Sequence, residues 1–323
     1  MFECLPLKFS RLTSKEWDEF INNSDNGTIF HTRKFISYHP ADRFSDNSLV
    51  IIKSNKIIAL FPAALLQDGK KTVLVSHPGA SYGGVVYKKT LNFHEAFQIV
   101  NGIIDYAKKN KITRIQITPP PVIYQSKYSN YIDFALVKNK FQYLKRDISS
   151  IVQLDFDSEN VLKTYKPEAR TAVKKAIKTG VKISECDLFE EYYQILKKNL
   201  KLRHNVNPTH TLVELLRIKK LFPKEIRLWG AFLEGKLIAG VCNFSANSNV
   251  VLAFYISHNE KYQENRAVNL LFYEIMKKYK EEGYKFLDFG IFTVDMEPNW
   301  GLARFKENFG ARGIFRDTYY KDI

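Results

Sequence analysis

The sequence predicts an α/β protein of two tandem domains, each with a mixed, mostly antiparallel sheet flanked by helices. The chain has 323 residues, which is enough for two hydrophobic cores. Each half contains a β-hairpin with a similar second strand, Lys-Ile-Ile-Ala from Lys56 and Lys-Leu-Ile-Ala from Lys236, roughly 180 residues apart. Each hairpin is followed by a strand, a helix and a further strand. This shared order favours two tandem domains over a solenoid.

In the first half, two helices are expected before the hairpin, over residues 14–22 and 32–39. The hairpin spans residues 49–66, with a tight turn at Ser54 and Asn55 between alternating or apolar runs. Apolar residues at intervals of three and four then predict a helix over 93–110. A strand over 113–118 completes this half.

The second half repeats this order. Helices are expected first, over residues 168–179, 188–203 and 211–221. The hairpin spans 226–245 and turns at Glu234 and Gly235. A helix over 269–283 and a strand over 285–290 follow. We place the domains at 1–150 and 151–323, and the strand over 149–156 fits either sheet.

The composition, 45% hydrophobic and 26% charged, is that of a folded protein. The longest apolar run, Ile57–Leu66, contains Pro62 and is too short to cross a bilayer. The N-terminus lacks the features of a signal peptide, so we expect a cytoplasmic protein without stable membrane insertion. Three widely spaced cysteines argue against a disulfide framework and a zinc site, and no metal is expected.

The formal net charge of +15 indicates an anionic partner. Three kinds fit this charge: a phosphorylated or nucleotide-linked substrate, an RNA such as tRNA, and the inner surface of a membrane. Alternatively, the charge is dispersed over Lys-rich helices and has no specific role.

The C-terminal segment combines a carboxylate with two cations. A buried strand over 286–289 carries Asp288 and is followed by Gly290, and the next predicted helix carries Arg304 and Lys306. Such a group could hold an anionic substrate. The alternative is a solvated amphipathic helix whose aromatic residues pack against the domain.

A second cationic group lies on the predicted helix that begins near Pro167 and ends at Gly180. Its cations fall on one helical face, at Arg170, Lys174, Lys175 and Lys178. The opposing apolar face is expected to contain Val173, Ala176 and Ile177. A cationic stripe with few acids nearby favours phosphate binding, and a solvated face is the alternative.

Four motifs together resemble the FemABX aminoacyl transferases and their GNAT-like relatives. They are Ile29–Tyr38, Ser76–Tyr87 with its Gly-Gly loop, Tyr165–Ile183, and Phe286–Gly290 followed by Gly301–Gly310. The resemblance implies tandem GNAT domains and amide formation between an activated aminoacyl or acyl donor and an amine of a cell-envelope, peptidoglycan-type precursor. The chain lacks the helical-hairpin arm of some members, so any role of that arm is absent.

Direct attack of an amine on an activated ester requires no covalent enzyme intermediate, and the sequence contains no Ser/His/Asp or Cys/His motif. We expect Lys306 to stabilise an oxyanion or a phosphate, Asp288 to orient or deprotonate the amine, and Tyr255 to supply a hydroxyl. The resemblance supports Lys306 best. Expected substrate- and phosphate-binding residues are Arg170, Lys174, Arg304, Tyr38 and Tyr82.

No bound cofactor is expected, and the favoured donor is aminoacyl-tRNA. A coenzyme A site usually has a Gly-rich turn that cradles the pyrophosphate, yet no glycine occurs between Gly240 and Gly283. We therefore predict no tight coenzyme A binding at the helix expected to start near Glu264, where Gln263 and Arg266 fit such a turn only loosely.

Two alternatives remain open from the sequence. One is an acyl-CoA-dependent N-acyltransferase acting on an amino sugar or a surface-polysaccharide intermediate. The other is a non-catalytic protein that binds RNA or a membrane surface through its basic stripe.

Overall fold

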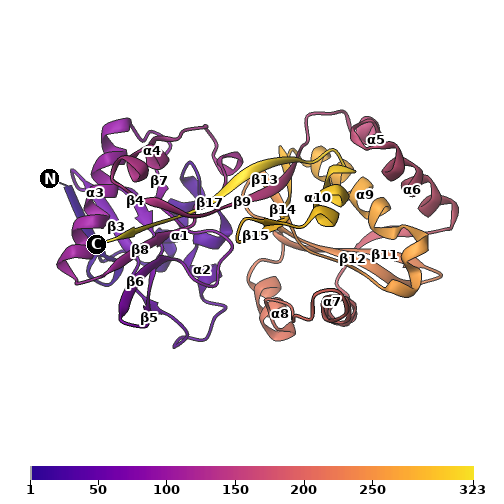
Figure 1. The fold of residues 1–323 in the computed structure, drawn as a ribbon, viewed down its shortest axis with the longest axis horizontal. Coiled ribbons are helices and arrows are strands. Elements are labelled where there is room, and N and C mark those ends of the chain that lie inside the picture. Colours follow the sequence, from indigo (N-terminus) through magenta and orange to yellow (C-terminus); the bar gives the residue numbers. More distant parts are fainter. Residues whose placement is uncertain (1) are drawn as a thin grey trace. The chain divides into compact units, whose positions relative to one another are not determined.

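The computed structural model describes residues 2–323, apart from the side chains at positions 203 and 204, and the chain forms two compact units (Figure 1). The first unit contains the residues up to Asp147 together with Phe315–Ile323, and the second contains Ile148–Ile314. Both are α/β, with sheets flanked by helices, as predicted. The sequence assigned all residues after 150 to the second domain, whereas Phe315–Ile323 lies with the first unit.

The first unit contains short sheets and four α-helices among its described residues. One sheet has the order β1-β3-β4-β7, and the strands β17-β8-β6-β5-β2 neighbour one another in that order. The bounds are β1 Phe2–Pro6, α1 Ser14–Asn23, α2 Arg33–Ile36, β2 Ser45–Asp46, β3 Leu49–Lys53, β4 Lys56–Phe61, β5 Ala64–Asp68, β6 Lys71–Ser76, β7 Val86–Tyr87, α3 Phe93–Lys109, β8 Arg114–Ile117, α4 Tyr131–Lys138, β9 Gln142–Gln153 and β17 Arg312–Asp322. Pro62 lies between β4 and β5, where a residue without an N–H interrupts the strand.

Helix α3 covers the main core of the first unit. Asn92 caps it: its side chain accepts from the Glu95 backbone N–H, and the Glu95 carboxylate accepts from the Asn92 N–H in return. Glu95 is buried, and both Lys53 and Lys88 pair with it. These ion pairs compensate the burial of the carboxylate and attach the start of α3 to the end of β3.

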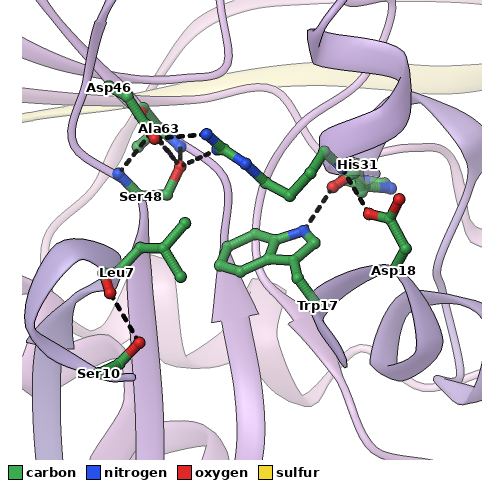
Figure 2. Close-up of polar contacts among 9 residues, drawn as sticks. Leu7, Ser10, Trp17, Asp18, His31, Asp46, Ser48 and Ala63 are labelled. Carbon is green, nitrogen blue, oxygen red and sulfur yellow. Dashed lines mark hydrogen bonds and ion pairs between the residues drawn. The ribbon is translucent and has the colours of Figure 1, made fainter. Parts of the chain in front are cut away.

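A polar network, buried at Trp17, His31 and Ser48 and exposed at Asp46, holds the entry helices α1 and α2. Figure 2 shows the Trp17 indole donating to the His31 carbonyl, and Ser48 bridging Asp46 and Ala63. The Arg33 guanidinium donates to the Asp46 carboxylate at 2.6 Å. This network fixes the motif Ile29–Tyr38 within the first unit.

The second unit is built on the sheet order β10-β11-β12-β13-β14-β9. Its bounds are α5 Val161–Thr164, α6 Pro167–Lys178, β10 Lys182–Cys186, α7 Phe189–His204, α8 Leu212–Leu221, β11 Ile226–Leu233, β12 Lys236–Ser245, β13 Val250–His258, α9 Ala267–Glu281, β14 Phe286–Ile291, β15 Thr293–Val294, β16 Glu297–Pro298 and α10 Trp300–Glu307. Residues 149–153 of β9 pair with β14, so this strand completes the second unit's sheet.

The two units repeat one pattern, as the sequence predicted. Both hairpins turn through two residues with positive φ, Ser54 and Asn55 in one and Glu234 and Gly235 in the other. Both also shift register shortly before the turn, after Ile51 and after Ala231 respectively. In each unit a helix then leads to a strand that pairs in parallel, β8 with β6 and β14 with β13. None of the described helices combines the length and the apolar character that a membrane span requires.

Candidate active site

The candidate site begins where two neighbouring strands of the second unit separate. The strands β13 and β14 pair only over Val250–Leu252 and Phe286–Asp288. Beyond this point β13 stays bonded to β12 as far as His258, whereas β14 pairs with β9. The end of β13 therefore has one edge free of β14.

A cavity of about 1040 Å³ lies beside this end of β13, entirely within the second unit. It is lined by the end of β13, the start of α9, and faces of α6, α7 and α10. The lining residues are Pro167, Glu168, Ala169, Thr171, Ala172, Lys175, Asn199, Leu200, Ile256, Ser257, His258, Tyr262, Gln263, Arg266, Ala267, Val268, Asn269, Asn299, Gly301, Leu302, Phe305 and Asn308. Its size suits an extended small-molecule group or the end of a larger substrate.

Ser257 lines the cavity, but its hydroxyl is enclosed by the protein. Ser257 is buried, and its Oγ has no hydrogen-bond partner among the described residues. An unpaired buried hydroxyl costs about 1–3 kcal/mol. This cost is borne by the fold, because the Oγ is not open to a ligand in the cavity.

The N-terminus of helix α9 also borders the cavity. The helix has 15 residues and begins at Ala267, and the preceding Arg266 is in the left-handed conformation with φ of 56° and makes no side-chain cap. The first backbone N–H groups of a helix lack partners within the helix and carry partial positive charge. Arg266 and Lys175 add full positive charges to the lining. This end of the cavity therefore favours an anionic or carbonyl-bearing group.

The expected helix start near Glu264 is wrong by a few residues. Gln263–Asn265 belong to a short 3-10 helix, Glu260–Asn265, and α9 starts only after Arg266. Glu264 is exposed and does not line the cavity. Its carboxylate is therefore not placed to compete with an anion bound in the cavity.

Lys306 is buried and holds the end of β14. It is only 2% exposed, and its Nζ donates to the carbonyls of Gly290 and Ile291, each at 2.7 Å. Burial lowers the pKa of Lys306 to about 8, and the nearby Asp288 carboxylate acts in the opposite direction. Lys306 does not line the cavity, but the preceding residue, Phe305, does.

Asp288 is completely buried in the same group. It accepts from the Ser149 hydroxyl at 2.6 Å and from the Gly290 N–H at 2.7 Å. The sequence correctly placed Asp288 near Lys306. It also grouped Lys306 with Arg304 in one candidate site, whereas Arg304 is exposed. Residues two apart on a helix point in different directions, so the two cations do not form one site.

Tyr255 lies on β13, two residues before Ser257, and is bonded within the second unit. Its hydroxyl accepts from the backbone N–H of His210 at 3.0 Å and contacts the His210 Nδ1 at 2.9 Å. Burial raises the pKa of the Tyr255 phenol. The sequence did not indicate that His210, which precedes α8, pairs with Tyr255. Tyr255 itself does not line the cavity.

The cationic stripe on α6 divides into two sets. Arg170 and Lys174 are exposed and do not line the cavity, whereas Lys175 does. The buried face of α6 consists of Ala169, Val173 and Ala176. Ile177, expected on the apolar face, is 56% exposed. The prediction for Ile177 was wrong because the buried stripe of α6 is narrow and Ile177 lies outside it.

Tyr38 and Tyr82 lie in the first unit and are buried. The Tyr38 hydroxyl donates to the Gly79 carbonyl at 3.1 Å, and the Tyr82 hydroxyl accepts from that of Tyr124 at 3.3 Å. In the adjacent Gly-Gly loop, a Cβ on Gly83 would lie 2.4 Å from the Ser76 carbonyl oxygen. This glycine therefore permits close approach of two backbone segments of the protein itself.

Comparison with known proteins supports the fold and the class of chemistry. Residues 166–317 match the acetyltransferase (GNAT) domain family. No curated protein sequence matches the chain. The crystal structure of FemX is similar with a TM-score of 0.76, at 14% identity over 99% of this chain and 97% of that one.

Two further structures share the fold over nearly the whole chain. One is the C-terminal domain of a protein assigned as a lysylphosphatidylglycerol synthetase from Agrobacterium fabrum, with a TM-score of 0.60 and 12% identity over 96% of this chain and 92% of that one. The other is a tandem GNAT protein from the clavulanic acid biosynthesis pathway, with a TM-score of 0.55 and 12% identity over 100% of this chain and 98% of that one.

The matched segment contains the whole cavity, including Ser257 and the start of α9. The chain therefore has the tandem GNAT fold of FemX, and its residues 166–317 match the GNAT acetyltransferase domain family.

Proposed function

We propose that the protein transfers an activated aminoacyl or acyl group, bound in the cavity of the second unit, to an amine of a cell-envelope precursor. The observation that carries this proposal is the cavity itself, where the N-terminus of α9 and the cations Arg266 and Lys175 border one large space. The likeness to FemX and to the lysylphosphatidylglycerol synthetase domain supports a cell-envelope acceptor.

The reaction is amide formation from an ester donor. The neutral amine attacks the carbonyl carbon, a C–N bond forms as the ester C–O bond breaks, and a proton passes from the amine to the departing hydroxyl oxygen. Negative charge develops on the carbonyl oxygen in the transition state. Donors and cations fixed in advance are the groups that stabilise such charge.

Two groups have the chemistry for these roles. The Lys306 ammonium, buried against the end of β14, supplies positive charge in a dry environment, where charge interactions are strong. Its two bonds to the end of β14 leave one ammonium proton. Asp288 holds the turn at Gly290 in place and keeps negative charge close to Lys306. The exposed Arg170, Lys174 and Arg304 are proposed as phosphate contacts.

Aminoacyl-tRNA is the favoured donor. Gln263 and Arg266 line the cavity with side chains at the place where a pyrophosphate would need close approach to the backbone. A ribose ester at the end of an RNA requires no such approach. The RNA's phosphates would meet a strongly basic chain, with a net charge of +15.

Acyl-CoA is the second candidate donor, with an amino sugar or a surface-polysaccharide intermediate as the acceptor. One observation favours it: the free N-terminus of α9 and the Arg266 side chain both border the cavity, and together they suit an anion.

The proposal is tested by filling the cavity. Ala172 lines the cavity from α6, so Ala172→Trp would occupy part of it, whereas Ile177→Trp changes an exposed position of the same helix. Mass spectrometry would identify ligands that copurify with each protein. We expect the wild type and Ile177→Trp to retain an acylated or adenosine-bearing ligand that Ala172→Trp loses. Identical ligands in all three proteins would contradict the proposal.

A further inference from the structure

A cluster of exposed aromatic rings lies on the first unit. Phe93 starts α3, and Tyr131 and Phe134 lie on α4; these side chains are 46%, 43% and 54% exposed. Ring centroids are 5.4 Å apart for Phe93 and Tyr131 and 5.6 Å apart for Phe93 and Phe134. Figure 1 shows α3 and α4 as neighbouring helices. We call Phe93, Tyr131, Phe134 and Val137 the aromatic patch.

The position of the patch follows from the pattern of α4. Ile132, Ala135 and Leu136 are buried, so they form the inner face of the helix. Phe134 and Val137 lie three residues apart on the outer face, and Val137 is also exposed. The core therefore does not account for the apolar residues of the outer face. Exposed apolar groups gathered in this way mark an interaction surface.

The charge around the patch is positive and unopposed. Lys127, Lys138 and Lys140 are exposed near the two ends of α4, and none forms an ion pair with another described residue. The acids nearby are already engaged, since Glu95 is buried between Lys53 and Lys88, and Asp133 accepts from the Tyr319 hydroxyl. Residues 88–140 contain nine Lys and Arg against three Asp and Glu.

We propose that the aromatic patch docks the protein on the surface of an anionic lipid bilayer. Phe and Tyr side chains of this kind enter the region between headgroups and acyl chains, and Lys side chains around them pair with lipid phosphates. Each Lys near such a surface adds to the attraction. Exposed rings surrounded by cations match the interface of an anionic bilayer, where apolar acyl chains lie beneath anionic headgroups. Docking would place the enzyme beside lipid-linked acceptors.

The test is cosedimentation of the full chain with vesicles. One set consists of phosphatidylcholine, and the other of phosphatidylcholine and phosphatidylglycerol in equal parts. We expect the wild type to bind the mixed vesicles and to bind the neutral ones only weakly. Added salt should dissociate the protein from the mixed vesicles. Two double variants, Phe93→Ser with Phe134→Ser and Lys127→Glu with Lys138→Glu, should each lower the partition coefficient by at least about tenfold.

Matched controls lie on the second unit. Val213 is 75% exposed on α8, and Lys220 and Lys224 are exposed at the end of that helix, so Val213→Ser and Lys220→Glu with Lys224→Glu should bind like the wild type. The charge variant leaves every ring in place, so it tests the proposal even if the aromatic variant misfolds. Wild-type binding that is absent, or that the patch and control variants lower equally, would overturn the proposal. Binding to an acidic protein without binding to vesicles would overturn it too.

Discussion

At the scale of single residues, Lys306 illustrates how burial changes the chemistry of a side chain. Two carbonyls accept hydrogen bonds from this deeply buried ammonium, and a nearby carboxylate compensates its charge. Without these partners the buried charge would be strongly destabilising. Desolvation still favours the neutral amine, which lowers the pKa to about 8. The residue is therefore charged at neutral pH but close to its titration midpoint.

This pKa predicts a pH limit on activity. If the positive charge of Lys306 stabilises the transition state, kcat/KM should fall as the pH rises through about 8, because the lysine then loses its proton. Lys306→Arg, if it folds, keeps its charge in this range and should lose this alkaline limb. Lys306→Met should lower kcat by about 100-fold or more at pH 7. An unchanged alkaline limb in the arginine variant would assign the titration to another group.

Lys306 also predicts how stability depends on pH. Its pKa is about 8 in the folded chain and near the ordinary lysine value of 10.5 when unfolded. Between these values the unfolded chain binds more protons, so this residue's contribution to the free energy of unfolding rises with pH. Below pH 8 both states are protonated and the contribution is constant. Urea titrations from pH 7 to pH 10 should therefore show the free energy of unfolding of the wild type rising relative to that of Lys306→Met. A constant difference between the two proteins over this range would show that Lys306 does not titrate there.

Ser257 carries a prediction about stability. Ser257→Ala removes a buried hydroxyl that has no protein partner, so the free energy of unfolding should be unchanged or slightly higher. Because the Oγ is enclosed by the protein, KM for the donor should also stay unchanged. A thermal melt and steady-state kinetics check both parts. A clear loss of stability, or a severalfold rise in KM, would show that the hydroxyl forms a hydrogen bond.

At the scale of elements, local chemistry determined most of what the sequence predicted. Two-residue turns with positive φ, capped helices and alternating strands are encoded by neighbouring residues, so both hairpins and the repeated order were correct. The cavity could not be predicted, because it depends on where β13 and β14 separate. The opposite environments of Lys306 and Arg304 were missed for a similar reason: tertiary packing decides which face of a short helix is buried.

The Gly-Gly loop provides a prediction at this scale. Gly83→Ala would place a Cβ within 2.5 Å of the backbone at Ser76 and His77, which cannot move as a side chain can. We expect a loss of roughly 1–3 kcal/mol in the free energy of unfolding. The matched change Gly301→Ala meets only Asn299, at 3.6 Å, and should be neutral or stabilising. Equal denaturation midpoints for the two variants would contradict the close backbone approach.

At the scale of the whole molecule, we assign binding of the donor to the second unit, where the family match and the cavity coincide. The net charge of +15 supports anionic partners on a broad surface but selects none of them. The donor is therefore decided by the shape and polarity of one cavity. Direct binding to that cavity distinguishes the two donor classes.

Calorimetric titration of donor analogues is the most direct test of this claim. The ligands are acetyl-CoA and an adenosine carrying an aminoacyl group through a stable 3′-amide, each titrated into the wild type, Ala172→Trp and Ile177→Trp. We predict that the aminoacyl-adenosine binds the wild type and Ile177→Trp but not Ala172→Trp. Acetyl-CoA should show no tight binding to any of the three proteins. Saturable acetyl-CoA binding in the low micromolar range, abolished by changes at Gln263 or Arg266, would contradict this prediction and establish the acyl-CoA donor instead.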